Sequence, residues 1–581
     1  MISRTALLVS LLLLSACGGG GSGGSTGGGT VVPTPAPTAP GAPTGVAANA
    51  GDGTAVVSFV APASTGGASI SRYDAACSAT AQTTRMASGA ATPLTVTGLV
   101  NGQTYGCTVS ATNSAGTGPA SAAVSVTPLA PVATADFPGS LVLGAPTDTG
   151  VRLKLQTTAL TGTAKAFYSA AGETVETATA AVTVTAGKTA ELAFAGLKPN
   201  VGYSYRLVLT PNSGATVNTR SYAFHTARPA GSSFTFTIQA DSHLDENANL
   251  DQYLRTLGNV LADQPDFHVD LGDTFMTEKY SEPFTAVLQA ATSRTVVDTR
   301  YTFERGNFGR VTHSVPLYLV NGNHDAELGW LLDGTPQNLP IWASLARLDS
   351  FAVPTPGAFY SGDSVIDPLA GNRVAWYAWT WGDALFVALD PYWNSTQKSS
   401  DGWSLTLGAR QYQWLATTLS ASTARYKFVF LHNLVGGLDG QMRGGIEAAP
   451  FYEWGGRNTD GSAGFAARRP GWSMPIHDLL VRNKVTAVFH GHDHVYVSQT
   501  LDGIVYQTVP QPSATNNNSG ASIAAAYHYA SGTILSSSGH LRVTVTPGGV
   551  TSRYVRSWLP KDETASRSNG QIDHSWTALP P

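Results

Sequence analysis

Five apolar segments of the chain end in side chains that can bind metal ions. The segments are "FTFTIQADSH", "DFHVDLGD", "VPLYLVNGNHD", "RYKFVFLHN" and "TAVFHGHDH". Their polar ends carry Asp241 and His243, then Asp273, then Asn323, His324 and Asp325, then His432, and finally His492 and His494. Carboxylate, imidazole and amide ligands without a thiolate suit ions such as Mn, Fe or Zn. Two such ions sharing a carboxylate can lower the pKa of a shared water and hold a phosphoryl group for in-line hydrolysis.

The surrounding sequence predicts an α/β arrangement that can bring these ends together. From about residue 231, strand-like runs alternate with helical patterns. The segment "NLDQYLRTLGNVLADQPD" predicts a helix with Leu250, Leu254, Leu257 and Leu261 on one face, and "GARQYQWLATTL" and "MPIHDLLVRN" predict two more. In open α/β sheets, ligands collect beyond the carboxyl ends of the strands, so we expect the five polar ends to converge there.

The order of these motifs resembles the calcineurin-type metallophosphoesterase family. The order is D-x-H, G-D, G-N-H-D, a lone H and G-H-x-H, and the resemblance spans roughly residues 233–550. It implies two divalent or trivalent metal ions (Mn, Fe or Zn) and hydrolysis of a phosphate ester by a hydroxide that both metals activate. The implied ligands are Asp241, His243, Asp273 and His494 for the first ion, and Asp273, Asn323, His432 and His492 for the second, with Asp273 as the bridge. His324 would be the general acid and Asp325 would orient it.

Two departures bear on the subfamily. Purple acid phosphatases have D-x-G and G-D-x-x-Y motifs, whereas this chain has "DSH" and carries Met276 at the tyrosine position. The ligand set therefore resembles the phosphodiesterase-like branch, and no ferric-tyrosinate colour is expected. Residues 129–228, with "GLKPNVGYSYRLVL", still resemble the β-sandwich that precedes the catalytic domain of purple acid phosphatases.

A Gly-rich, aromatic segment follows His432 and is expected to form part of the site rim. Its arginines Arg443, Arg457, Arg468 and Arg469 are candidates to grip an anionic group of the substrate, and ordinary loop salt bridges are the alternative. We expect Tyr452, Trp454 and Trp472 to pack in the core of the loop, and stacking on a base or sugar ring is the alternative. His490 is expected to be a strand residue, and Asp493 to lie next to the metal ligands. His268, His313, His477 and His540 match no motif position and are interpreted as structural.

Residues 42–128 resemble a fibronectin type III domain, most closely in "PLTVTGLVNGQTYGCTVSATNSAGTGPAS". Phe59 stands where the family has tryptophan. The resemblance makes the strands of Cys77 and Cys107 neighbours, so we expect a disulfide between them. Two buried free thiols are the alternative.

The N-terminus resembles a bacterial lipoprotein signal. Residues 1–17 combine Arg4, an apolar stretch and the lipobox-like "LSAC", which predicts acylation of Cys17 and export. A plain secretory signal is the alternative. Residues 18–41 are a Gly/Ser/Pro linker, and Gly18 favours an outer-membrane or cell-surface location.

The expected fold is two all-β immunoglobulin-like sandwiches followed by a four-layer α/β/β/α domain over residues 229–560. A hairpin around "PGG" would complete its sheet, and residues 561–581 would form a loose tail. With 12 % charged residues and a net charge of −4, no nucleic-acid partner is expected, which disfavours a nuclease of this fold. The alternative to an enzyme on small phosphate esters is an adhesion or glycan-binding lipoprotein with an inactive phosphoesterase domain. The sequence leaves mono- versus diester hydrolysis and the oligomeric state open.

Overall fold

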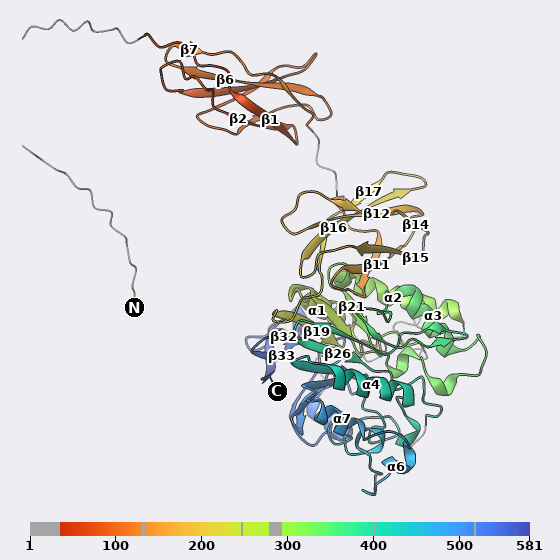
Figure 1. Cartoon of the computed structure of the whole chain (residues 1–581). Helices are drawn as coiled ribbons and strands as arrows, with labels where there is room; N and C mark the ends of the chain where they lie inside the picture. The colour runs from red at the N-terminus through yellow and green to blue at the C-terminus, as the bar shows by residue number, and fades with distance from the viewer. Residues whose placement is uncertain are drawn as a thin grey trace, which may run out of the picture. The chain divides into compact units, whose positions relative to one another are not determined.

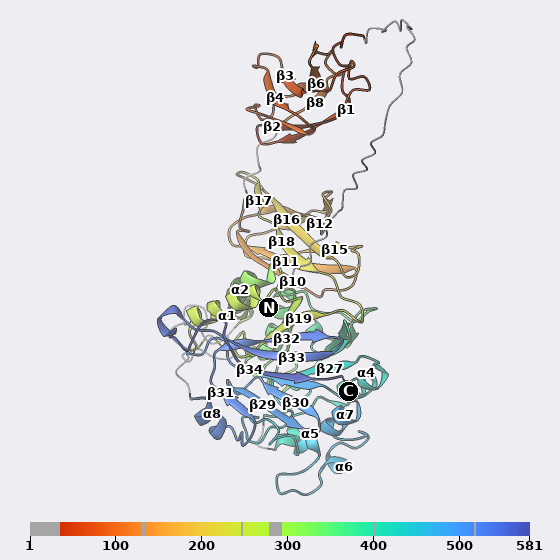
Figure 2. The ribbon, with the colours of Figure 1, turned by 90° about the vertical axis from the view of Figure 1, so that its left-hand side faces the viewer.

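The computed structural model describes residues 35–128, 134–243, 245, 248–277, 293–398, 401–515 and 519–580. Contacts between residues divide the chain into two compact units, Met1–Val132 and Ala133–Pro581 (Figures 1 and 2). Cys17 and the predicted signal lie outside the described residues. Among the helices of those residues, none has the length and apolarity needed to cross a bilayer.

The first unit is a small β-sandwich. Its two sheets, β1-β2-β5 and β4-β3-β6-β7 with β8 beside β6, enclose a core that includes Val57, Phe59 and Tyr73. Cys77 and Cys107 are directly opposite each other on β3 and β6 and are joined by a disulfide. The strands are β1 (Thr44–Gly51), β2 (Thr54–Val60), β3 (Arg72–Ser78), β4 (Arg85–Gly89), β5 (Leu94–Thr97), β6 (Tyr105–Asn113), β7 (Gly116–Thr117) and β8 (Val124–Val126).

The second unit begins with another β-sandwich, and one sheet of this sandwich continues into the α/β part. Alternating inward residues such as Leu153, Leu155 and Leu207 fill its core. The last sandwich strand of the shared sheet, β10, pairs with β21 of the α/β part through Gly144 and Leu317. The strands of this second sandwich are β9 (Thr134–Ala135), β10 (Gly139–Gly144), β11 (Gly150–Thr157), β12 (Gly162–Ala170), β13 (Thr177–Ala178), β14 (Val182–Val184), β15 (Thr189–Ala195), β16 (Gly202–Pro211), β17 (Val217–Thr219) and β18 (Tyr222–His225). The expected boundary at residues 228/229 therefore does not separate two sheets.

Two large sheets form the centre of the second unit. Aromatic side chains of one sheet, such as Phe236, pack against those of the other, such as Phe386 and Phe428. The sheet orders are β15-β11-β10-β21-β20-β19-β32-β33-β34 and β22-β25-β26-β27-β28-β30-β29-β31. The central strands are parallel: β19 (Phe234–Gln239), β20 (Phe267–Asp270) and β21 (Leu317–Leu319) in the first sheet, and β26 (Ala384–Ala388), β27 (Tyr426–Phe430), β28 (Ala487–His490) and β30 (Ile504–Thr508) in the second. The remaining strands of the second sheet are β22 (Ser361–Gly362), β25 (Tyr377–Trp381), β29 (Tyr496–Leu501) and β31 (Thr533–Leu535), and β23 (Ile366–Asp367) pairs separately with β24 (Gly371–Asn372).

Helices cover the outer faces of these sheets. Val142 of β10 and Phe308 of α2 share one apolar cluster, and Val429 of β27 and Leu415 of α4 share another. The structure has helices at the three predicted places: α1 (Leu250–Ala262), α4 (Ala409–Ala421) and α7 (Ile476–Arg482). It also has α2 (Arg294–Thr312), α3 (Leu339–Ser350), α5 (Tyr452–Gly455), α6 (Phe465–Arg468) and α8 (Gly520–Ala526).

The C-terminal residues are not a loose tail. The predicted hairpin is present as β32 (Gly539–Thr546) and β33 (Gly549–Arg556). Beyond it, β34 (Ile572–Ala578) pairs with β33 along its length and forms the edge of the sheet. Trp576 explains why this segment is ordered, since its ring packs against the central core and its Nε1–H donates to Gln507 Oε1 at 2.9 Å.

Candidate metal centre

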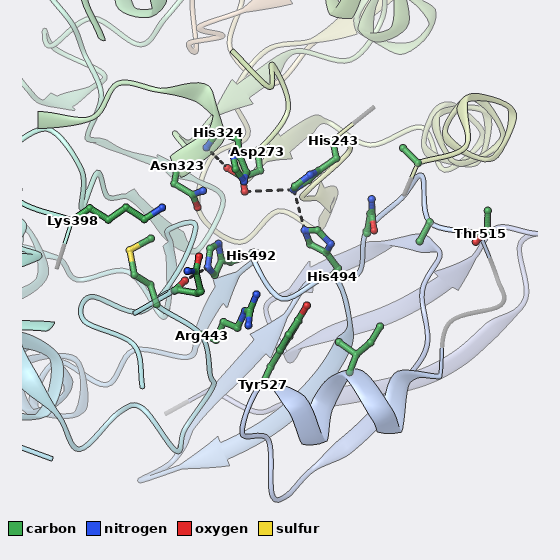
Figure 3. A pocket seen from close by; sticks show the side chains of 16 residues that line it. His243, Asp273, Asn323, His324, Lys398, Arg443, His492, His494, Thr515 and Tyr527 are labelled. Carbon is green, nitrogen blue, oxygen red and sulfur yellow. Dashed lines mark hydrogen bonds and ion pairs between the residues drawn. The ribbon is translucent and has the colours of Figure 1, made fainter. Parts of the chain in front are cut away.

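The predicted ligands lie just beyond the ends of five parallel strands. Asp241 and His243 follow β19, Asp273 follows β20, Asn323 follows β21, His432 follows β27, and His492 and His494 follow β28. Because the two sheets pack face to face, these strand ends meet at one place. Figure 3 shows His243, Asp273, Asn323, His324, His492 and His494 around one pocket.

The backbone at these ends is turned sharply into the left-handed region. Asp241, Asp273 and His492 have φ angles of 62°, 55° and 74°. Non-glycine residues rarely adopt such angles, and they persist only where the surrounding structure enforces them. Glycine makes the close approach of the loops possible, because a Cβ at Gly272 would lie 2.2 Å from the Gly322 nitrogen. The strained turns direct the ligand side chains inward.

Asp273 lies between two groups of ligands. Its Oδ2 is 3.5 Å from His243 Nε2 and 3.0 Å from His432 Nε2. Three sets of side chains have ligand atoms within 4.8 Å of one another: Asp241 with His243 and His494; Asp273 with His432 and His492; and His243 with Asp273 and His324. The first two sets match the two implied metal positions, and the Asp273 carboxylate is placed to be shared.

Three of the four ligand imidazoles, those of His243, His432 and His492, have a polar partner at the nitrogen that faces away from the cluster. His243 Nδ1 lies 3.2 Å from Asp245 Oδ2, and His432 Nδ1 donates to the Leu271 carbonyl at 2.9 Å. His492 Nε2 donates to the Gln441 carbonyl at 2.5 Å. The opposite nitrogens then face the cluster, where His243 Nε2 and His494 Nε2 are 2.9 Å apart. Outer hydrogen bonds of this kind fix the tautomer and direction of metal-binding histidines.

The donor atoms also fit metal ions in their chemistry. Asn323 Oδ1 is buried and has no hydrogen-bond partner among the described residues, although it lies in a polar pocket. A buried acceptor without a donor is costly, and a cation would satisfy it. Carboxylates, imidazoles and one amide oxygen are together a suitable ligand set for Mn, Fe or Zn.

The two aspartates of the cluster have different electrostatic environments. Burial raises the pKa of Asp241 to about 7. Burial also opposes ionisation of Asp273, but the adjacent His432 and His324 outweigh it and hold the pKa of Asp273 well below its usual range. Asp273 is therefore the carboxylate that positive charge stabilises most directly, which suits a bridging ligand.

Asp325 holds the backbone of the two loops that carry these ligands. Its Oδ2 accepts hydrogen bonds from the amides of Asp273 and Gly322 at 3.0 and 2.7 Å. Its Oδ1 accepts from the amides of Thr274 and Phe275 at 3.0 and 2.9 Å. The sequence predicts that Asp325 orients His324. The four contacts show that its carboxylate binds backbone amides, one of them in the loop that carries His324 and three in the loop that carries Asp273.

The pocket has a volume of about 640 Å³. His324, the expected proton donor, lines it, and its backbone N–H donates to Asp273 Oδ1 at 2.7 Å. Lys398, Arg443 and Tyr527 also line the pocket (Figure 3). The site therefore combines the ligand cluster with cationic and aromatic walls.

Of the four candidate arginines, Arg443 alone lines this pocket. Arg468 pairs with Asp401 at 3.3 Å, Arg469 pairs with the buried Glu453 at 2.5 Å, and Arg457 is exposed. For Arg468 and Arg469 the structure thus shows the loop salt bridges that were the alternative.

The other aromatic and histidine residues pack or hydrogen-bond away from the ligand atoms. Trp454 is fully buried, and Trp472 stacks on Tyr412 with ring centroids 3.9 Å apart. Hydrogen-bond partners of the remaining residues are Thr237 for His268, Ser314 for His313, Tyr506 for His477, Thr508 for His490, Asp263 for His540, and Gly444 and Tyr529 for Asp493.

Four described residues that contribute to the site were not foreseen: Asp245, Gln441, Lys398 and Tyr527. Asp245 could have been found, because it continues the D-x-H motif at the next alternate position. Gln441 acts through its carbonyl, so its side-chain type gives no signal. Lys398 lies between the third and fourth motif segments and is a lone lysine in a polar loop.

Comparison with known proteins agrees with this geometry. Residues 234–496 match the family model described as calcineurin-like phosphoesterase, and residues 41–127 match the fibronectin type III domain. A solved structure of PhoD is similar at 14 % identity and a TM-score of 0.55, over 78 % of this chain and 91 % of that one. The purple acid phosphatase PPD1 from yellow lupin (Lupinus luteus) seeds is 15 % identical with a TM-score of 0.49, over 90 % and 92 % of the two chains. No curated protein matches the chain in sequence. The chain thus carries a calcineurin-like phosphoesterase domain with Asp/His clusters that could hold metal, and it shares its fold with PhoD.

Proposed function

We propose that this protein hydrolyses a phosphate ester at a centre of two metal ions, with His324 as the general acid. The observation that carries the proposal is the position of the Asp273 carboxylate between His243 and His432, which belong to two separate ligand groups. Asp241, His243, Asp273 and His494 would hold one ion, and Asp273, Asn323, His432 and His492 the other. When bound, such a pair of Mn, Fe or Zn ions supplies an activated water and neutralises charge on the phosphoryl group.

The residues of the chain supply the remaining needs of the reaction. His324 lines the pocket beside the cluster and can deliver a proton to the leaving alkoxide, whose expulsion is otherwise difficult near neutral pH. Asp325 fixes the loops on both sides of the cluster, so that His324 and Asp273 keep their relative position. Lys398 and Arg443 bring positive charge to a pocket that must receive an anion.

The decisive experiment uses the full chain, stripped of metal and refilled with Mn, Fe or Zn. Hydrolysis is measured with p-nitrophenyl phosphate and bis(p-nitrophenyl) phosphate, which also distinguishes mono- from diester activity. We expect His324→Ala to lower kcat by about 10²- to 10⁴-fold while the metal content stays the same. His225→Ala, in a sandwich strand, is the matched control and keeps full activity. A wild-type protein with two bound ions and no activity on either ester would favour the adhesion or glycan-binding alternative.

The proposal also places the protein outside the cytoplasm, tethered through acylated Cys17. It is supported by the lipobox-like "LSAC" and the Gly/Ser/Pro linker that follows. Labelled palmitate should enter the wild-type protein and not Cys17→Ser, and globomycin should block processing of the wild type. Processing that is insensitive to globomycin would instead support a plain secretory signal.

A further inference from the structure

The side chain of Arg443 lines the pocket and stacks on the ring of Tyr527. Its guanidinium carbon lies 4.1 Å from the centre of the Tyr527 ring, and Figure 3 shows the two side chains together at the wall near His494. The Arg443 side chain is 32 % exposed, so the group is accessible from the pocket while one face is covered. Stacking on an aromatic ring restricts the guanidinium without using its N–H donors.

The loop that carries Arg443 is fastened to the ligand turn. The carbonyl of Gln441 accepts a hydrogen bond from His492 Nε2 at 2.5 Å, and the amide of Gly444 donates to Asp493 Oδ2 at 3.0 Å. The amide of Leu438 donates to the Arg443 carbonyl at 2.9 Å and closes the loop. The backbone on both sides of Arg443 is therefore held at a fixed position relative to His492.

The donors of Arg443 are largely uncommitted. Its closest carboxylate, Asp439, has an oxygen 3.9 Å away, which is an ion pair beyond hydrogen-bond distance. Within the described part of the chain, its guanidinium makes no hydrogen bond. Arg469, in the same segment, instead binds the carboxylate of Glu453 and the carbonyls of Trp403 and Leu405. A pre-oriented planar fork with free donors in a pocket is suited to a bidentate contact with an oxyanion.

We propose that Arg443 and Tyr527 form a subsite for a second anionic group, so that the preferred substrate is a phosphate ester whose alcohol carries a further carboxylate or phosphate. This inference rests on the proposed phosphoesterase function. Among the described residues that line the pocket, Lys398 is the second lysine or arginine, and Figure 3 shows it beside Asn323, away from Arg443. The two cations thus lie on different walls, which suits a substrate with two separated negative groups.

The test compares three esters with the same three-carbon length: propyl phosphate, 2-carboxyethyl phosphate and propane-1,3-diyl bisphosphate. If the wild type hydrolyses only bis(p-nitrophenyl) phosphate, the corresponding p-nitrophenyl diesters are used. We expect kcat/KM for at least one doubly anionic ester to exceed that of propyl phosphate about tenfold or more, as a charge-assisted hydrogen bond would give. Comparison of the carboxylate and phosphate esters identifies which anion the subsite prefers.

Variants then assign the preference to the subsite. Arg443→Gln should lower the ratio of kcat/KM for the preferred ester over propyl phosphate about tenfold, and Tyr527→Leu should lower it less. Arg482→Gln, on an exposed arginine of α7, is the control and keeps the wild-type ratio. Equal rates on the three esters in the wild type, or an equal loss on all three in Arg443→Gln, would overturn the inference, the latter by showing that Arg443 grips the scissile phosphoryl group. Absence of hydrolysis of every ester, including the p-nitrophenyl compounds, would instead contradict the proposed function.

Discussion

Oδ2 of Asp325 accepts a hydrogen bond from the backbone amide of Asp273 at 3.0 Å, so the carboxylate of one loop holds the main chain of the other. Replacement by alanine removes this link and three more amide contacts. We expect Asp325→Ala to weaken metal binding about 10- to 100-fold, as loss of a supporting contact does. Elemental analysis after dialysis at defined free metal measures this. Asp478→Ala, on the exposed side of α7, should bind metal as the wild type does.

The shared position of Asp273 predicts an unequal effect of ligand substitutions. His492 and His494 belong to different ligand groups, so His492→Ala and His494→Ala should each retain about one of two ions. Asp273→Ala removes the carboxylate common to both and should retain less than either. Titration with Mn or Zn followed by calorimetry gives the stoichiometry. The same stoichiometry in all three variants would contradict a bridging role.

A buried ion network next to the site should control stability. Arg347 and Arg373 each contact the carboxylate of Glu327 at 2.5 Å, and all three side chains are buried. Glu327→Gln leaves the buried Arg347 guanidinium without its counter-charge and leaves Arg373 with only Asp390, 3.1 Å away, so we expect the free energy of unfolding to fall by about 3–5 kcal/mol. Glu563→Gln, which breaks an exposed pair with Arg255, should cost about 1 kcal/mol or less. Urea denaturation measures both.

The same network predicts a pH dependence. Burial opposes ionisation of Glu327, but Arg347 and Arg373 outweigh it and lower its pKa from 4.5 to about 2. Because the folded pKa lies below the unfolded value, its stabilisation is complete above about pH 4.5 and is lost as the pH falls towards 2. The unfolding free energy of the wild type should therefore decrease over this range by a contribution of about 3 kcal/mol that Glu327→Gln lacks. Parallel pH profiles of the two proteins would contradict this assignment.

The disulfide should stabilise its own unit alone. Cys77 and Cys107 are 30 residues apart, for which loop-closure entropy predicts a stabilisation of about 3–4 kcal/mol. In the double variant Cys77→Ala/Cys107→Ala, the calorimetric transition of the first unit should move to lower temperature. The transition of residues 133–581 and the esterase activity should not change, because those residues form a separate compact unit.

The final strand should contribute measurably to stability. Trp576→Ala removes an indole that packs on the central core and its hydrogen bond to Gln507, and should lower the free energy of unfolding by about 2 kcal/mol. Leu579→Ala, at a position 75 % exposed just after the strand, is the control and should have little effect. Equal stability of both variants would mean that β34 is dispensable.

Much of the site's composition could be predicted because its ligands are chemically distinctive and each follows an apolar run. The helix at 250–262 was visible from its regular leucines. Helix α2 could not be predicted in this way, because its buried face includes the charged residues Arg300, Glu304 and Arg305, which interrupt the helical spacing of apolar residues. The left-handed backbone angles at Asp241 and His492 could not be predicted from the sequence either, because they are imposed by the surrounding structure and not by the preferences of these residue types.

The sequence also could not reveal how the second sandwich joins the α/β part. Residues 129–228 have the alternating strands of a free-standing sandwich, and the junction of the sheets depends on a single residue pair, Gly144 and Leu317. Such a pairing leaves no pattern in the sequence, because its determinant is the close packing of β10 against α2. The edge strand β34 was missed because the polar His574 lies on the same face as Trp576, and Ile572 at the start of the strand is exposed.

The pairing of β10 with β21 has a practical consequence for engineering. A catalytic fragment cut at residue 229 would remove β10 and leave β21 at the edge of its sheet, with the pairing between Gly144 and Leu317 lost, and exposed sheet edges promote aggregation. It would also remove the strand on which α2 packs, and with it the hydrogen bond that the Thr312 hydroxyl donates to the Leu141 carbonyl at 2.9 Å. A minimal expressible enzyme should therefore start near residue 134, and the fibronectin-like unit is the piece that can be exchanged or omitted.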